Sequence, residues 1–297
     1  MTTDPILTLA WLVLTHLAAD FLLQTDRIAT DKFGTGRKAT KALAMHVALV
    51  AVCLIPVVVL WGGAGFTFAI VVIAGHAVID RAKIILTRYV EAKAIARAHR
   101  EHEGRSSAEG LGSAWTPAPA ALFVLDQVLH LAVMGVAWAI WLASAPLMST
   151  WTSFAGSLLG SFDQAILHRL VLVVVVGLDL VIVNVRAGAL FVATLVAPRA
   201  MVTGHDPMTG SGSKDRAIAA AALPRIGATI GVLERLLIVT LILTGAEAAI
   251  GLVIAAKTLA RFRQLDDRPF AEYYLLGTLA SVSVALMSGL LALAALR

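Results

Sequence analysis

The sequence predicts an all-α, polytopic integral membrane protein with about eight transmembrane helices. Of its 297 residues, 59% are hydrophobic and only 14% are charged. The mean hydropathy of +0.86 exceeds what a soluble domain needs to fill its core. Aromatic residues make up only 6% of the chain, so the apolar excess is aliphatic, which is typical of lipid-facing helices rather than of barrel strands. The composition therefore excludes the soluble, disordered and β-barrel classes.

Eight apolar stretches are candidates for spans, since a spanning helix needs roughly 20 mostly apolar residues. They are 5–23, 42–61, 66–86, 120–143, 167–187, 226–244, 246–262 and 273–295. The seventh is the shortest, and it follows the sixth after only Thr244 and Gly245. We expect two domains from this pattern: four spans in 1–143, and four more in 144–297 with a long cytoplasmic loop at 188–225.

Lysine and arginine residues gather in every second connection. The connections after the first, third, fifth and seventh spans are basic, and the alternate ones hold little beyond Arg169. Basic connections stay on the cytoplasmic side, so the pattern predicts that both termini lie outside. The same loops account for the formal charge of +5, and they lack the aromatic residues and motifs of nucleic-acid binding. We therefore expect the lipid bilayer, and no nucleic acid, as a partner.

Seven histidine and aspartate side chains interrupt the first four spans. They are His16, Asp20, His46, His76, Asp80, Asp126 and His130. In three of the spans a histidine and an aspartate are four residues apart, which places them on one helix face. Ionisable residues inside spans face the bundle interior. At a rise of 1.5 Å per residue, all seven fall within a slab of roughly 10 Å toward the cytoplasmic side.

Four imidazoles and three carboxylates at one depth predict a divalent-metal site. The nitrogen ligands favour Zn²⁺, with Mn²⁺ or Fe²⁺ as alternatives, over Ca²⁺ or Mg²⁺. The single cysteine, Cys53, excludes a cysteine-based site. Seven ligands exceed the needs of one tetrahedral ion, so we expect two or more ions, an arrangement suited to phosphoester hydrolysis. A proton or ion relay, and simple polar contacts between helices, are the alternatives.

Further polar residues flank this set and suggest roles beside the metal. Gln24, Arg81 and Gln127 are candidates to support the ligands or to contact a substrate. Lys83 lies three residues after Asp80, on the same helix face, where it would hold a substrate phosphate or pair with the carboxylate. As catalytic residues we expect Lys83, together with Asp20 or Asp80 as the group that accepts a proton.

Three strings carry a resemblance to a known family. The segments 16–26 (HLAADFLLQTD), 76–83 (HAVIDRAK) and 125–130 (LDQVLH) resemble the bacterial inner-membrane family catalogued as domain of unknown function 3307, over roughly 5–143. The resemblance implies a multi-pass protein of the bacterial cytoplasmic membrane with a C-terminal membrane extension, and implies little about activity.

The repeated His-x-x-x-Asp pairs are also distantly similar to those of metal-dependent membrane hydrolases, and of soluble zinc phospholipases C and single-strand nucleases that use three zinc ions. The chain lacks the N-terminal tryptophan ligand of those soluble enzymes, and Asp126 and His130 stand in the reverse order.

The C-terminal spans contain a second set of charged residues, formed by Glu234, Arg235, Lys257, Arg261 and Glu272. One interpretation is an ion-pair network in which Lys257 or Arg261 pairs with Glu234, and Glu272 pairs with the other cation. The other is a site for an anionic headgroup, built on Arg235, Lys257 and Arg261.

The function that fits these observations best is metal-dependent hydrolysis of a phosphoester, on a lipid-linked or phosphorylated small molecule near the membrane. The rival is a proton or divalent-cation transporter or channel, which Asp179 and Glu234, nearer mid-membrane, favour. The third is a non-catalytic membrane scaffold or sensor whose hairpin at 87–118 binds a partner.

Overall fold

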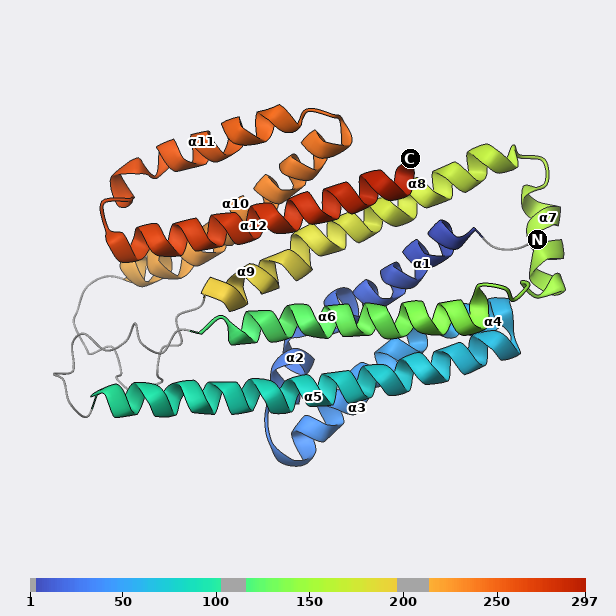
Figure 1. Ribbon diagram of the computed structural model, residues 1–297, viewed down its shortest axis with the longest axis horizontal. Coiled ribbons are helices and arrows are strands. Elements are labelled where there is room, and N and C mark those ends of the chain that lie inside the picture. The colour runs from blue at the N-terminus through green and yellow to red at the C-terminus, as the bar shows by residue number, and fades with distance from the viewer. Residues whose placement is uncertain (1–3, 103–115, 197–213) are drawn as a thin grey trace. The chain divides into compact units, whose positions relative to one another are not determined.

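The computed structural model describes residues 4–102, 116–196 and 214–297, and the described residues form helices with no strand (Figure 1). The α-helices are α1 (Pro5–Leu17), α2 (Asp26–Lys32), α3 (Gly36–Cys53), α4 (Ile55–Trp61), α5 (Gly63–His102), α6 (Ala118–Ala137), α7 (Ser149–Leu159), α8 (Gln164–Ile182), α9 (Gly188–Val196), α10 (Lys214–Leu243), α11 (Ile250–Ala260) and α12 (Arg268–Leu296). The all-α prediction is confirmed.

Contacts divide the chain into two compact units that alternate along the sequence. Unit 1 comprises Met1–Leu86, Leu122–Arg186 and Ala292–Arg297. Unit 2 comprises Thr87–Ala121 and Ala187–Leu291. The predicted boundary after residue 143 stays a prediction.

Among the described residues, five helical segments are long and apolar enough to cross a membrane. They are Pro5–Leu23, Gly36–Trp61, Ala118–Leu142, Gln164–Val196 and Phe270–Leu296. They coincide with the first, second, fourth, fifth and eighth predicted spans, which supports the membrane class. The third and sixth lie inside α5 and α10 and remain predictions. The seventh is too short, because the 11 residues of α11 extend for roughly 16 Å, about half the hydrocarbon thickness. Eight spans are therefore not confirmed.

The predicted loop at 188–225 is partly helical. Its first residues form α9, which directly continues the helical path of α8, and its last residues begin α10. The Gly- and Ser-rich middle of this loop lies outside the described residues, as does most of the Gly/Ser/Pro part of the 87–118 hairpin. The apolar run 188–196 explains the first difference, since its hydrophobic side chains favour a continued helix over an exposed loop.

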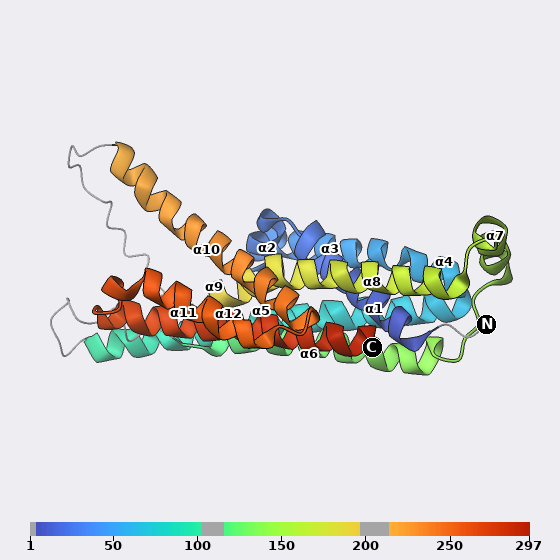
Figure 2. The same cartoon turned by 90° about the horizontal axis from the view of Figure 1, so that it is seen from above.

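In unit 1, the chain reverses direction between α1 and α3. Thr25 caps α2 by accepting a hydrogen bond from the backbone N–H of Ile28 at 3.3 Å, as expected of a threonine at an N-cap. Gly36, with a φ of 72°, then starts α3. The short helix α2 thus packs against α3, and α1 packs against α8 (Figures 1 and 2). The sequence predicts only a basic connection at 24–41, so α2 is a feature that it does not foresee.

An apolar cluster fills unit 1 on one side of the seven His/Asp residues. Its buried members include Leu12, Leu54, Val57, Trp61, Phe68 and Leu142. Along each helix these residues lie beyond the His/Asp positions, in the direction away from α2. Leu12 precedes His16 in the sequence, whereas Leu142 follows His130. The cluster therefore closes that end of the unit.

A tight turn between α4 and α5 gives a first testable prediction. A side chain at Gly65 would overlap the carbonyl oxygen of Val57, whereas one at Gly63 would meet nothing within 4 Å. We expect Gly65→Ala to lower the free energy of unfolding by about 1–3 kcal/mol, and Gly63→Ala to change it by less than about 0.5 kcal/mol. Thermal melts in one detergent measure the difference. Equal melting temperatures would contradict the described packing.

Candidate metal centre

The structure brings the seven predicted His/Asp residues together inside unit 1. Helix α1 contributes His16, a π-helical turn at Ala18–Leu23 contributes Asp20, and α3, α5 and α6 contribute the other five. The Asp20 side chain is 9% exposed, and the remaining six residues are buried. Three groups of these side chains place ligand atoms within 4.8 Å of one another, so they could hold a metal ion. The π-helical turn agrees with this, because such turns are frequent at functional sites.

Four ligand atoms converge at the centre of the cluster. The Nε2 atom of His46 lies 2.9 Å from His76 Nε2, 3.5 Å from Asp20 Oδ1 and 3.4 Å from Asp80 Oδ2. His76 Nε2 lies 3.6 Å from Asp20 Oδ1. Ligands of a tetrahedral zinc ion with bonds of 2.0–2.1 Å are about 3.3–3.4 Å apart. The distances from His46 Nε2 to the two carboxylates match this spacing. His46, His76 and Asp80 form one of the three groups that could hold an ion, and His76 also belongs to a group with His16 and Asp20.

A second part of the cluster surrounds His130. Its ring centroid lies 4.0 Å from that of His76 and 5.1 Å from that of His16. Its Nδ1 lies 3.6 Å from Asp126 Oδ1. Within the described part of the chain, both nitrogens of His130, the Oδ1 of Asp126 and the Oδ1 of Asp20 are buried without a hydrogen-bond partner. Burial of each such atom without a partner costs roughly 1–3 kcal/mol of folding free energy. These nitrogen and oxygen atoms therefore fit a site in which they bind a cation.

Two lysines pair with carboxylates of the cluster. Lys83 Nζ lies 2.6 Å from Asp126 Oδ2 and 5.1 Å above the ring of Phe123. Lys32 Nζ lies 2.9 Å from Asp80 Oδ2 and 2.9 Å from Gln24 Oε1. The sequence predicts Lys83 beside the site, but it does not predict Lys32 there, because Lys32 belongs to a basic connection. Thr25 followed by Asp26 is a pattern typical of a helix start, and it could have indicated the helix that contains Lys32.

Gln127 connects three of the predicted ligands. Its Oε1 lies 3.2 Å from His16 Nε2, and its Nε2 donates hydrogen bonds to Asp20 Oδ2 at 3.4 Å and to Asp126 Oδ2 at 3.0 Å. Such contacts orient ligand side chains. Arg81 is exposed, so the structure does not bring it into this enclosed cluster.

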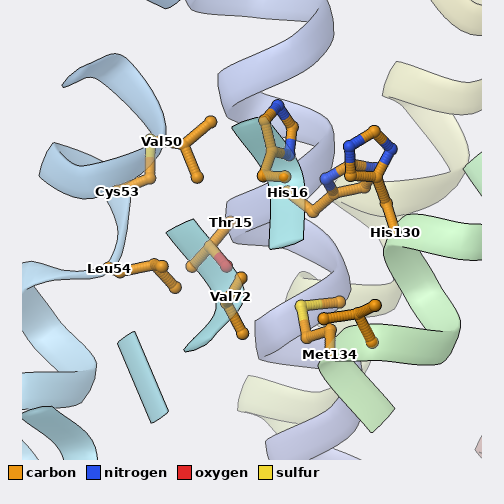
Figure 3. A pocket seen from close by; sticks show the side chains of 10 residues that line it. Thr15, His16, Val50, Cys53, Leu54, Val72, His130 and Met134 are labelled. Atoms are coloured by element: carbon orange, nitrogen blue, oxygen red, sulfur yellow. The ribbon is translucent and has the colours of Figure 1, made fainter. Parts of the chain in front are cut away.

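A small cavity of about 10 Å³ adjoins the imidazoles on the side of the apolar cluster. Figure 3 shows the rings of His16 and His130 on one side of it, and Leu54, Val72 and Met134 on the other. This volume holds about one water molecule. A substrate larger than water therefore has no room on this side, and the partly exposed Lys83, at 15%, marks the more open side.

The second set of charged residues lies in unit 2. Lys257 Nζ is 2.6 Å from Glu234 Oε2, and Arg235 Nη1 donates to Ser281 Oγ at 3.0 Å. Glu272 instead pairs with Arg268 at 3.0 Å, on the exposed surface. The structure thus pairs Glu272 with Arg268, one helical turn away, and not with Lys257 or Arg261 as the sequence interpretation expects.

The comparisons with known proteins give one match. A family described as "Protein of unknown function (DUF3307)" matches residues 8–159. That segment contains all seven His/Asp residues and both buried lysines. No curated protein and no solved structure matches the chain.

Proposed function

Since the chain belongs to the DUF3307 family of proteins of unknown function, we propose its function from the site itself: metal-dependent hydrolysis of a phosphoester within the membrane. The observation that supports this is the group of His46, His76 and Asp80 at ligand spacing, with Asp20 3.5 Å from His46, beside the ammonium groups of Lys32 and Lys83. Ligands that bind a divalent cation and cations that attract phosphate are the two requirements of such a site.

The charges of the cluster bear on the number of ions. Three carboxylates face two lysines, so the cluster has a net charge of about −1 when the imidazoles are neutral. One divalent ion reverses this to about +1, and a second raises it to about +3, which an anionic substrate would offset. We expect at least one ion, zinc in first place, in the free protein. Two or more ions are expected once a phosphate is bound.

The protein residues have distinct roles in this proposal. A divalent ion held by the His/Asp residues would supply a water molecule of lowered pKa and would polarise the phosphoryl oxygen. Lys83, which lies on the more open side, exchanges Asp126 for a phosphate oxygen and offsets its negative charge. Asp20 or Asp80 accepts the proton of the attacking water. Gln127 holds the Asp20 and Asp126 carboxylates in place.

The surroundings of the site suggest a substrate close to the membrane. Five of the seven His/Asp residues lie on helical segments that are long and apolar enough to span a bilayer, so a lipid-linked or phosphorylated small molecule is the substrate class we propose. The basic residues beside α2 further lead us to place that end of unit 1 at the cytoplasmic face of a bacterial inner membrane, with both termini outside.

Hydrolysis assays with the zinc-loaded protein in detergent test the proposal. The substrates are short-chain lipids with phosphomonoester and phosphodiester headgroups, and released phosphate or alcohol is measured. We expect Lys83→Gln to lower kcat by about 100-fold, as loss of one charge-stabilising group does in other enzymes. Lys93→Gln, on the same helix but outside the cluster, serves as the matched control. Equal rates for the two variants, or no turnover of any substrate, would refute the hydrolase.

One observation favours a transporter instead. Asp179 lies near the middle of the apolar helical segment Gln164–Val196, and its Oδ1 is buried without a hydrogen-bond partner among the described residues. Acidic groups at several depths are typical of proton and cation pathways. The apolar cluster beyond the His/Asp residues opposes this reading. Proton or zinc flux into liposomes that Asp179→Asn abolishes, without loss of bound metal, would favour the transporter.

A further inference from the structure

Unit 2 contains a cavity of about 480 Å³ that the proposed hydrolase does not use. This volume falls within the range of small-molecule binding sites. Helices α9, α10, α11 and α12 all contribute to its lining. Much of the wall consists of small residues, among them Ala189, Ala193, Gly227, Gly231 and Gly277. Small side chains leave the length of the cavity open to an apolar chain.

The same cavity has three cationic side chains in its lining, Arg235, Lys257 and Arg261. Arg235 is only 2% exposed, and its Nη1 donates to Ser281 Oγ, which also lines the cavity. Lys257 lies 5.5 Å from the ring centroid of Tyr274. Lys257 Nζ also pairs with Glu234 Oε2 at 2.6 Å. The cavity thus gathers three cationic side chains in one lining.

A hydroxyl group points independently to a ligand. Thr278 lines the cavity and is 7% exposed. Its Oγ1 has no hydrogen-bond partner among the described residues. A buried polar atom of this kind is normally satisfied, and a hydroxyl donates readily to an anionic oxygen.

We infer that this cavity binds an amphiphile with a phosphate headgroup of net negative charge. The headgroup lies among Arg235, Lys257, Arg261 and the Thr278 hydroxyl, and the apolar tail lies along the small-residue wall formed by α9, α10 and α12. Arginine suits this role because its planar guanidinium group binds phosphate oxygens in pairs. An ion pair of Glu234 with Lys257 alone explains neither the size of the cavity nor the unpaired hydroxyl.

Native mass spectrometry of the full-length protein in a neutral detergent tests this inference. The probes are dioctanoyl phosphatidic acid, dioctanoyl phosphatidylcholine and inorganic phosphate. We expect one equivalent of phosphatidic acid to bind at least about tenfold more tightly than either of the others. Equal binding of phosphatidylcholine would overturn the role of the cations. Equal binding of inorganic phosphate would overturn the role of the tail.

Variants assign the binding to this cavity. Arg261→Gln should weaken phosphatidic acid binding about tenfold, whereas Arg263→Gln, exposed and outside the lining, should leave it unchanged. Gly277→Leu should block the apolar wall, since its Cβ already approaches Val196 Cγ1 at 3.5 Å. Gly251→Leu, where a Cβ meets nothing within 4 Å, is the matched control. Unchanged binding in both test variants would place the lipid elsewhere. Metal content and hydrolysis report on unit 1 residues, so a failure here leaves the proposed function standing.

Discussion

We expect His76→Ala to weaken zinc binding by at least about 100-fold. His76 belongs to two of the three groups that could hold a metal ion, and its ring lies within 6 Å of those of His16, His46 and His130. Loss of a residue that only supports a ligand already costs 10–100-fold in affinity, and a direct ligand should cost more. Competition with a fluorescent zinc chelator measures the dissociation constant.

His168→Ala is the matched control for this variant. His168 pairs with Asp4 at 3.2 Å, and its side chain is 41% exposed, so its loss should leave zinc affinity unchanged. Size-exclusion profiles of both variants check that the protein remains folded. If His76→Ala binds zinc as tightly as His168→Ala, the buried imidazoles do not form the metal centre.

The second large effect concerns Lys32, the residue that the sequence analysis misses. Its side chain is 6% exposed and pairs with Asp80, which is 1% exposed. Removing one partner of a buried ion pair leaves an uncompensated charge and costs roughly 3–5 kcal/mol. We therefore expect Lys32→Met to lower the stability of the metal-free protein by about that amount, measured as the free energy of unfolding in detergent.

Zinc should reverse much of this loss. A divalent ion compensates the Asp80 charge that Lys32 otherwise neutralises, so zinc should raise the melting temperature of Lys32→Met more than that of the wild type. Lys38→Met is the control, because Lys38 pairs with Asp31 at 2.9 Å but is 71% exposed, and such pairs contribute about 1 kcal/mol or less. A metal-free Lys32→Met protein as stable as Lys38→Met would contradict the role of Lys32.

Helical periodicity made most of the metal centre predictable. Pairs such as His16 with Asp20 and Asp126 with His130 share a helix face by their spacing alone. Counting residues from the span ends placed them at one depth, and the structure brings them within ligand distance. His46 has no partner four residues away, yet depth alone predicted its position correctly.

Lys32 was not predictable in the same way, because its burial depends on tertiary packing. A basic residue in a polar connection normally stays in solvent. Here α2 packs against α3, and this carries the ammonium group to Asp80. The pairing of Glu272 failed for a related reason, since Arg268 is close in sequence whereas Lys257 and Arg261 are on another helix.

The number of spans was the least predictable part of the fold. Hydropathy identifies apolar stretches but not where a helix ends. The stretch 246–262 contains a 3₁₀ turn at Glu247–Ala249 before α11 begins, which shortens the α-helix below a bilayer's thickness. The prediction of one loop over 188–225 was wrong at its start, because the apolar residues 188–196 form α9, which follows α8 after a π-helical turn.

The most direct test of the metal centre is elemental analysis of the full-length protein, purified in detergent without added chelator and then incubated with zinc. The three groups of His/Asp ligand atoms in the cluster predict at least one tightly bound equivalent of zinc, manganese or iron per chain after desalting. Folded protein that retains less than about a tenth of an equivalent would show that the cluster is not a metal site.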